Sequence, residues 1–343
     1  KHYQMTDGNE TIQHSPNLNM LQTDQNGDIW ALGKDGRMFQ YNPDWDVFQL
    51  KLKFTDSIQS KKRLPLTLTK IDRNDNLWLC TKNSQYIYEI PTGDFYQLES
   101  EINEEITCLA QADENHYYIG TTHSIYYATL NGKSLHIEKD SQLENFHIIH
   151  HLYYHQPSGN LLIGTLMDGF YLYNQQERLL EKLGNMNDVN INAVIPYQQS
   201  QEEILMATDG NGVYKLNMNT KKLETYFSVN HHYSNKMNGD IIKDIYEDEE
   251  QRLWMAVFPI GITVYSDKYP SYELLRHSQE NPNSLISNQI TYIMEDSDGD
   301  IWFATSNGVC CYYTKEKKWK SMLSSYQQER DEQNYVFISL CEA

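Results

Sequence analysis

Residues 277–312 read HSQENPNSLISNQITYIMEDSDGDIWFATSNGVCCY. An alternating apolar strand begins at Ile290 and ends at Asp296, and a polar turn then leads into a second apolar strand centred on Trp302. Alternation with a period of two is typical of β-strands, and Asp, Asn and Gly promote tight turns. The stretch therefore predicts two antiparallel strands joined by a short hairpin.

The same pattern occurs seven times along the chain. The turn-plus-strand cores read DQNGDIWALG, DRNDNLWLCT, DENHYYIGT, QPSGNLLIGT, QSQEEILMAT, EDEEQRLWMAV and EDSDGDIWFAT. Their central residues are Trp30, Trp78, Tyr118, Leu162, Leu205, Trp254 and Trp302. A repeat of roughly 45 residues with four short strands fits propeller blades. We predict an all-β fold, a seven-bladed β-propeller of four-stranded antiparallel blades, over residues 1–334.

Other positions of the repeat also have a physical interpretation. Two residues after the centre stands a small side chain, which suits a close approach of neighbouring blades: Cys80, Gly120, Gly164, Ala207, Ala256 and Ala304. A threonine then suits the strand end: Thr81, Thr121, Thr165, Thr208 and Thr305. The third strand is rich in tyrosine and the fourth is the outer strand, as around Phe48, Phe95 and Trp319.

Residues at both ends of the chain lie outside the seven repeats. Residues 335–343 resemble the first strand of a following repeat, and we predict that they start a second propeller. Residues 2–5 resemble an outer strand without its own blade. We expect them to pair into the last blade and close the ring, because closure removes exposed strand edges.

The charge of the chain limits its partners. The net charge is −19, so general binding of nucleic acid is not expected, and an anionic ligand would need a local basic pocket. Lys61, Lys62 and Arg63 form the only dense basic stretch, which we interpret as a solvated loop. No apolar run approaches the ~18–20 residues that span a bilayer, and we expect no signal peptide among the residues before the repeats. The charge and the apolar pattern of the sequence fit either a cytosolic protein or a mature exported fragment.

The seventh unit resembles a known repeat. The stretch Asn283-Ser-Leu-Ile-Ser-Asn288, the alternating strand, the Gly turn, Ile301-Trp302 and Thr305 are similar to the two-component-regulator propeller repeat. That repeat builds the periplasmic sensor half of hybrid two-component systems in Bacteroides-type bacteria. The units around Trp30 and Trp254 are similar to it as well, whereas the third to fifth units match loosely.

The resemblance implies a larger parent protein. Family members carry two propellers, an immunoglobulin-like module, one membrane span, a histidine kinase, a receiver and a DNA-binding module. The chain then corresponds to the first, periplasmic propeller, with the second propeller and the immunoglobulin-like module as partners in the same chain and a homodimer as the parent assembly. The implied ligand is an oligosaccharide, and the implied role is control of glycan-utilisation genes.

No catalytic constellation stands out in the sequence, and we predict a non-catalytic fragment without cofactor or metal. Asp296-x-Asp298-Gly-Asp300 superficially resembles a calcium loop but lacks its closing Glu, so a hairpin turn is the better interpretation. His147, His150, His151 and His155 are close in sequence. The adjacent pair His150-His151 would point to opposite faces of a strand, which makes a shared metal site awkward.

Turn residues at one face of the propeller are the candidate ligand-binding residues. Short polar side chains beside an aromatic ring suit sugar hydroxyls and the apolar face of a sugar. The candidates are Asp35, Asn83, His123, Asp168, Asp209, Asn211, Phe258 and Asn307. Two other functions stay open: a propeller-fold polysaccharide lyase or hydrolase, which would lose a metal-dependent activity on changing His150 or His151, and a protein-interaction scaffold that binds no sugar.

Overall fold

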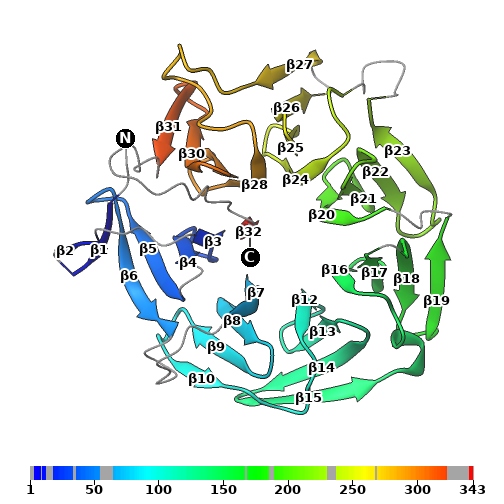
Figure 1. Cartoon of the computed structure of the whole chain (residues 1–343). Helices are drawn as coiled ribbons and strands as arrows, with labels where there is room; N and C mark the ends of the chain where they lie inside the picture. Colours follow the sequence, from blue (N-terminus) through cyan, green and yellow to red (C-terminus); the bar gives the residue numbers. More distant parts are fainter. Residues whose placement is uncertain are drawn as a thin grey trace. The chain divides into compact units, whose positions relative to one another are not determined.

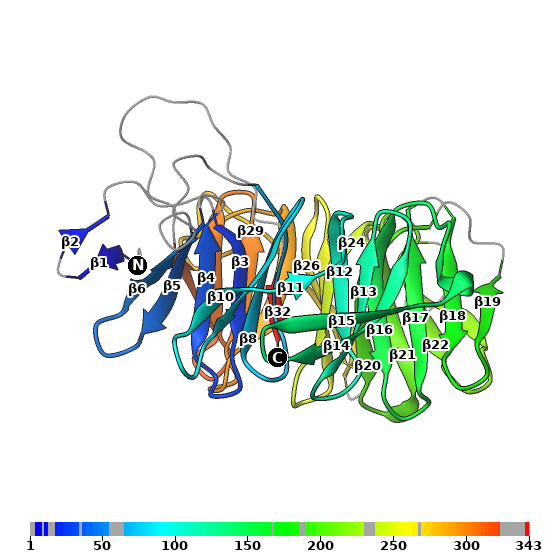
Figure 2. The same cartoon turned by 90° about the horizontal axis from the view of Figure 1, so that it is seen from below.

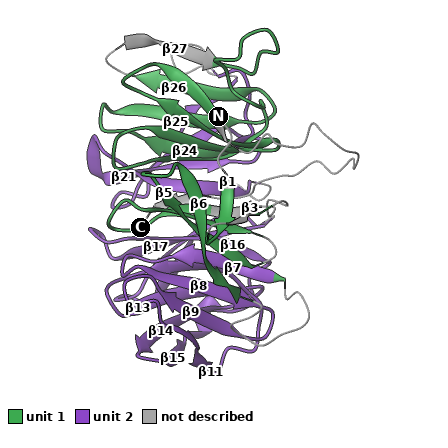
Figure 3. Ribbon diagram, turned by 90° about the vertical axis from the view of Figure 1, so that its left-hand side faces the viewer, with its two compact units in different colours: residues 1–65, 243–343 green, residues 66–242 purple. Residues whose placement is uncertain are grey.

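A computed structural model describes residues 4–8, 10–12, 18–33, 36–54, 65–166, 168–184, 189–229, 237–266, 269–322 and 340–342. The chain divides into two compact units, which Figure 3 colours separately. Unit 1 comprises residues 1–65 and 243–343, and unit 2 comprises residues 66–242. Across both units the strands form seven successive sheets, each built on four antiparallel strands, so the all-β, seven-bladed β-propeller predicted from the repeat is confirmed.

Unit 1 holds the first, sixth and seventh blades, labelled in Figure 1. The first blade has β3 (Leu18–Thr23), β4 (Ile29–Gly33), β5 (Arg37–Asn42) and β6 (Val47–Lys53). The sixth has β24 (Ile242–Glu247), β25 (Arg252–Val257), β26 (Gly261–Ser266) and β27 (Tyr269–Leu275). The seventh has β28 (Ile290–Glu295), β29 (Ile301–Thr305), β30 (Gly308–Tyr313) and β31 (Lys318–Met322).

Unit 2 holds the second to fifth blades; Figure 2 shows strands of the third to fifth standing side by side. The second has β7 (Leu66–Ile71), β8 (Asn76–Thr81), β9 (Gln85–Glu89) and β10 (Phe95–Gln97). The third has β12 (Ile106–Gln111), β13 (His116–Thr121), β14 (Ile125–Asn131) and β15 (Ser134–Lys139), with β11 (Glu99–Ser100) added outside β15. The fourth has β16 (Ile149–His155), β17 (Asn160–Thr165), β18 (Phe170–Asn174) and β19 (Leu179–Leu183), and the fifth has β20 (Ile191–Tyr197), β21 (Ser200–Thr208), β22 (Val213–Asn217) and β23 (Leu223–Phe227).

One aspartate closes the first turn in each of the four blades that carry the central tryptophan. In the second blade, Asp72 Oδ1 accepts the backbone N–H groups of Asn74 and Asn76 at 2.9 and 3.0 Å, and Oδ2 accepts Trp78 Nε1 at 2.9 Å. Trp30, Trp254 and Trp302 donate in the same way to the aspartate six residues before them. The carboxylate thus fixes the hairpin and satisfies the indole N–H inside the sheet packing.

The threonine at the end of the second strand has a matching role at the next turn. Its hydroxyl donates to the carbonyl that precedes or opens the third strand, as in Thr121 to Ser124 at 2.9 Å and Thr208 to Gly212 at 2.7 Å. The same bond occurs at Thr81, Thr165 and Thr305. This side-chain bond holds the two-to-three turn at a fixed geometry, and that turn is where the candidate ligand residues lie.

Small side chains allow neighbouring blades to approach closely, as the repeat predicts. A Cβ atom added at Gly120 would lie 2.5 Å from Cys108 Sγ and 3.0 Å from Ile149 Cγ2 of the next blade. A Cβ atom at Gly164 would meet Ile191 of the fifth blade at 3.0 Å. Neighbouring blades are therefore in van der Waals contact at these two glycines, with no room for a larger side chain.

Polar side chains link the inner strands of neighbouring blades within each unit. Thr107 on β12 donates its hydroxyl to the carbonyl of Ile149 on β16 at 2.6 Å. In unit 1, Asp244 on β24 accepts the N–H of Ile293 on β28 at 2.5 Å and the N–H of Ile245 at 2.9 Å. Burial raises the pKa of Asp244 well above its ordinary value, against the effect of those two N–H groups. These bonds link inner strands whose edges would otherwise be unpaired.

The N-terminal expectation was wrong. β1 (Gln4–Asp7) pairs in parallel with β6, the outer strand of the first blade, and not with the last blade. A short antiparallel strand, β2 (Glu10–Thr11), then pairs with β1. β6 is the outer strand of its blade, and an outer strand has an edge that can accept a further strand.

The described C-terminal residues form β32 (Leu340–Glu342), which pairs in parallel with β3, Leu21 opposite Leu340. That residues 335–343 begin a second propeller stays a prediction. Within the described part of the chain, no helix is both long and apolar enough to cross a membrane. The one helix named there is the 3₁₀ turn η1 (Ser141–Leu143).

Candidate functional site

Seven of the eight predicted ligand residues lie in turns between the second and third strands of their blades, as the repeat implies. Asp35 falls outside the described residues. Unit 2 contains Asn83, His123, Asp168, Asp209 and Asn211, and unit 1 contains Phe258 and Asn307. Whether they bind a ligand stays a prediction.

The structure brings two of these candidates together in unit 2. The segment 144–148, which leads into β16, runs between the turn of His123 and the turn of Asp168. His123 Nδ1 lies 3.0 Å from the carbonyl of Phe146, and the N–H of Phe146 donates to the carbonyl of His123 at 3.0 Å. On the other side, the N–H of Leu166 donates to the carbonyl of Ile148 at 2.9 Å.

Side chains of this segment point both to solvent and to the aspartate. His147 is 77% exposed, and its Nε2 lies 3.9 Å from Asp168 Oδ2, a carboxylate that is 34% exposed. Beside them Ile148 is 42% exposed, one of three exposed large apolar side chains among the residues that the structure describes. The group combines an imidazole, a carboxylate and an apolar surface that solvent reaches.

Two aromatic rings pack beneath the solvent-facing side chains of residues 144–148, on the protein interior side. Phe146 is buried and packs edge-on against Tyr171, with 5.4 Å between ring centroids. Lys182 Nζ lies 5.6 Å from the centroid of the Tyr171 ring. We name the group His123, His147, Ile148, Asp168 and Tyr171 the 144–148 site. Its chemistry suits a ligand with hydroxyl groups and an apolar face.

The remaining candidates stand in separate local settings. The Asp209–Gly212 turn is held by backbone bonds: Asp209 N–H donates to Asn190, and the N–H groups of Gly210 and Gly212 donate to Asp240 at 3.1 and 2.8 Å. Gly212 has φ +75°, and a Cβ there would collide with the carbonyl of Phe227, so only glycine fits.

Three candidates are simpler turn residues. Asn83 and Asn307 are exposed, and the N–H of Asn307 donates to Thr305 Oγ1 at 3.0 Å. Phe258 precedes a cis proline, and Lys243 Nζ lies 6.0 Å from the centroid of its ring. These contacts position the turns without joining the candidates of different blades.

The histidines of the fourth inner strand do not converge. His150 is exposed, whereas His155 is buried, with Nδ1 2.8 Å from Ser158 Oγ and Nε2 2.9 Å from the carbonyl of Gln201. Burial lowers the pKa of His155. Among the described residues, no three His, Cys, Asp or Glu side chains are grouped so that they could hold a metal ion.

The turn at Asp296 is a hairpin turn, as interpreted from the sequence. Asp296 Oδ1 accepts the N–H groups of Asp298 and Asp300, both at 3.0 Å, and Oδ2 accepts Trp302 Nε1 at 2.7 Å. The basic stretch Lys61–Arg63 lies outside the described residues.

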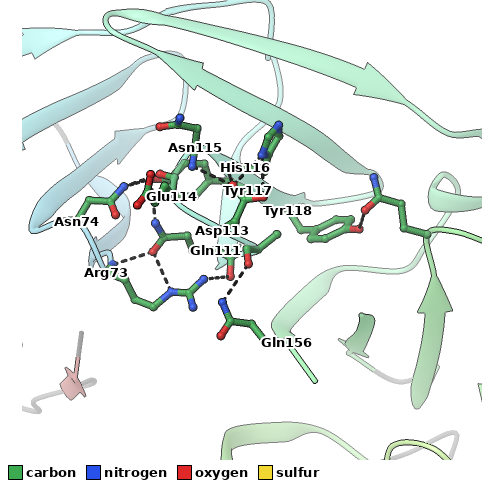
Figure 4. Close-up of polar contacts among 12 residues, drawn as sticks. Arg73, Asn74, Gln111, Asp113, Glu114, Asn115, His116, Tyr117, Tyr118 and Gln156 are labelled. Carbon is green, nitrogen blue, oxygen red and sulfur yellow. Dashed lines mark hydrogen bonds and ion pairs between the residues drawn. The ribbon is translucent and has the colours of Figure 1, made fainter. Parts of the chain in front are cut away.

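Sequence reasoning missed a set of polar contacts between neighbouring blades of unit 2, most of them near the turns between the first and second strands, shown in Figure 4. Arg73 donates to the side chain and the carbonyl of Gln111 in the next blade at 3.3 and 2.8 Å. Gln156 donates to the carbonyl of Ala112, and Tyr118 donates to Gln175 at 2.8 Å. These bonds tie the second, third and fourth blades together, a role that no local pattern signals.

Comparisons with known proteins agree with this fold. Residues 284–307, in the seventh blade, match the model of the two component regulator propeller. No protein with a curated description matches the chain.

Among solved structures, the chain resembles the extracellular domain of the candidate hybrid two component system BT4673 from B. thetaiotaomicron, with 17% identity and a TM-score of 0.67 over 87% of this chain and 38% of that one. The corresponding domain of BT3049 from the same organism gives 18% identity and a TM-score of 0.65 over 85% and 39%. The WD40 β-propeller of Doa1 gives 12% and 0.61 over 88% and 93%. The chain thus spans less than two fifths of the two extracellular domains, and the likeness shows the fold.

Proposed function

We propose that this chain, which carries a two-component-regulator propeller repeat, is the extracytoplasmic ligand-sensing propeller of a hybrid two-component regulator, with an oligosaccharide as its ligand. The observation that carries the proposal is the match of residues 284–307 to that repeat. The likeness in fold to extracellular domains of such systems supports it.

The role is binding without catalysis, in the periplasm. The parent protein would add a second propeller and an immunoglobulin-like module, pair as a homodimer, and control glycan-utilisation genes. A ligand can shift such an assembly between two conformations only if it binds one of the two conformations more tightly than the other.

The 144–148 site is the place in unit 2 best suited to a sugar. A carboxylate such as Asp168 accepts hydrogen bonds from hydroxyl groups, and the His147 imidazole either donates or accepts one. Ile148, which is 42% exposed, and the half-buried Tyr171 provide apolar surface next to these groups. Turns held by side-chain bonds, such as that of Thr121 to Ser124, keep these groups in place before the ligand arrives.

A thermal-shift screen of the chain against a panel of oligosaccharides tests the proposal. A ligand that binds only the folded state raises the melting temperature, by roughly RT ln(1 + [L]/Kd) in free energy. We expect one glycan class to raise it, and Asp168→Asn to remove most of the shift. Asp94→Asn, in an exposed turn of the second blade, is the matched control and retains it.

The other outcomes separate the alternatives. A shift that survives Asp168→Asn places the sugar outside the 144–148 site while keeping the sensor role. The absence of any shift with every glycan favours a protein-interaction scaffold. Release of shortened or unsaturated sugar during the screen indicates a hydrolase or a lyase.

A further inference from the structure

The first blade carries an indole ring that the packing of the blade does not use. Trp45 lies in the turn between β5 and β6 and is 73% exposed. The central tryptophans of the four blades that have one are buried, and Trp319 is half-buried. An indole left in water gives up the stabilisation that burial of so large an apolar surface provides. The position of Trp45 therefore needs an explanation outside the blade.

The equivalent turns of other blades carry polar residues where the first blade has Trp45. In each of these turns the following residue has a positive φ, as Asp46 does at +56°. The residues at the position of Trp45 in the second, fourth, fifth and seventh blades are Thr92, Glu177, Thr220 and Glu316, all exposed.

The same side-chain bond holds several of these turns. Asn42 Oδ1 accepts the N–H of Trp45 at 3.1 Å. In the fourth and fifth blades, the asparagine three residues earlier makes this bond at 2.9 and 2.8 Å to Glu177 and Thr220. The turn therefore folds equally well around a threonine or a glutamate, and nothing in its backbone requires an aromatic side chain.

Two blades of unit 1 fix the turn that presents Trp45. The hydroxyl of Tyr41 donates to Asp46 Oδ1 at 2.8 Å. From β31 of the seventh blade, Lys320 Nζ lies 3.4 Å from Asp46 Oδ2 and donates to the hydroxyl of Tyr313 at 3.2 Å. Both partners of this ion pair are less than 20% exposed. Because the turn is held before a ligand arrives, little conformational freedom is lost on binding.

The surroundings of Trp45 distinguish between classes of partner. Among the described residues, the other exposed large apolar side chains are Ile148 and Leu179, and both belong to unit 2. A protein interface needs an apolar core of several residues within roughly 800 Å² on each side, which a single indole does not provide. The neighbouring carboxylate of Asp44 is exposed and disfavours an anionic lipid surface. One sugar ring, by contrast, needs one aromatic ring and a few polar groups.

We propose that Trp45 stacks on one ring of a neutral oligosaccharide, so that unit 1 has a sugar-binding position of its own. This rests on the proposed function and specifies its ligand class. The flat indole matches the C–H groups on the apolar face of a pyranose, and the Asp44 carboxylate accepts hydrogen bonds from hydroxyl groups. The same carboxylate, in a chain of net charge −19, repels uronate and sulfated sugars.

The test is a titration of the whole chain with three neutral hexasaccharides: cellohexaose, mannohexaose and β-1,4-galactohexaose. The readouts are tryptophan emission and its quenching by acrylamide, and hexagalacturonate is the charged control. A sugar that covers the exposed indole shifts the emission to shorter wavelength and reduces quenching, both saturably. We expect this response from at least one neutral hexasaccharide and not from hexagalacturonate. No response to any neutral sugar overturns the inference, as does an equal or stronger response to hexagalacturonate.

Trp45→Thr introduces the residue that the equivalent turns of the second and fifth blades carry, so we expect it to fold with an unchanged melting temperature. It should weaken binding of the responding sugar by about tenfold or more in calorimetry, the effect of losing one aromatic contact. Trp45→Phe keeps a flat ring and should retain part of the affinity. Glu177→Thr, at the same position of the fourth blade, is the matched control and retains all of it. Unchanged affinity in Trp45→Thr overturns the inference.

The inference and the proposed function fail separately. If a neutral oligosaccharide raises the melting temperature and Trp45→Thr binds it with full affinity, the sensor role stands and the assignment of Trp45 is overturned. If no sugar raises the melting temperature or changes the fluorescence, both fail. Protection from acrylamide that grows with protein concentration, without sugar, identifies a contact between two copies of the chain and overturns the inference.

Discussion

Replacing Asp72 with alanine removes the acceptor that closes the first turn of the second blade. Its carboxylate is buried and accepts the indole N–H of Trp78 at 2.9 Å and the hydroxyl of Tyr117, in the next blade, at 2.7 Å. It also accepts the backbone N–H groups of Asn74 and Asn76. One side chain thus holds a turn, the central tryptophan and the neighbouring sheet.

The indole N–H of Trp78 and the hydroxyl of Tyr117, both buried, determine how much stability the Asp72→Ala variant loses. Each buried donor left without a partner costs about 1–3 kcal/mol, so their sum is about 4 kcal/mol in the free energy of unfolding. The N–H groups of Asn74 and Asn76 lie nearer the surface, where water replaces part of the loss. With an unfolding entropy of about 2.1 cal/mol/K per residue, the melting temperature falls by about 6 °C.

The measurement is urea and thermal unfolding followed by tryptophan fluorescence. The matched control is Asp113→Ala, at the equivalent turn of the third blade, where the carboxylate is 58% exposed and accepts Asn115 N–H and His116 N–H at 3.0 Å. We expect that variant to cost under about 1 kcal/mol, because water reaches its donors. Equal losses in the two variants would refute the reasoning, since the buried indole and phenol would then contribute nothing.

Three further predictions concern packing and pH. Gly120→Ala should cost about 1–3 kcal/mol in urea unfolding because its Cβ would press on Cys108 Sγ, and adding Cys108→Ala should recover part of the loss. Burial lowers the pKa of His151 to about 3, so the folded state binds fewer protons than the unfolded chain; stability should fall as pH drops from about 6.5 toward 3, and His151→Gln should flatten that fall. Burial raises the pKa of Asp244, so stability should instead fall as pH rises above about 4, and a pH series that is unchanged in Asp244→Asn would contradict this.

The sequence predicted the repeat because its signals are local. The hairpin after each inner strand depends on Asp, Asn and Gly within a few residues, and the strands depend on alternation that is visible within one segment. Asp72 and Trp78 lie six residues apart in sequence, and the indole-to-carboxylate bond spans one turn. Their blade could therefore be recognised without knowing what surrounds it.

Contacts between blades needed the tertiary structure. His123 and Asp168 are joined through residues 144–148, which belong to neither turn, and no periodicity relates the three segments. The same holds for Lys70, which reaches the carbonyl of Leu109 across the edge of its own sheet. Which polar side chains meet depends on how neighbouring sheets are staggered.

At the N-terminus, too, the sequence predicted the strand, and only the tertiary structure showed which strand it pairs with. The sequence alone identified residues 2–5 as an extra outer strand, and the described part of that stretch, Gln4 and Met5, lies in β1. Their partner was decided by tertiary structure: β1 pairs with β6. A strand's tendency to extend is a property of its own residues, whereas its partner is whichever free edge the folded chain places beside it. The sequence by itself therefore determined seven blades and their turns, and packing between sheets decided which residues form sites.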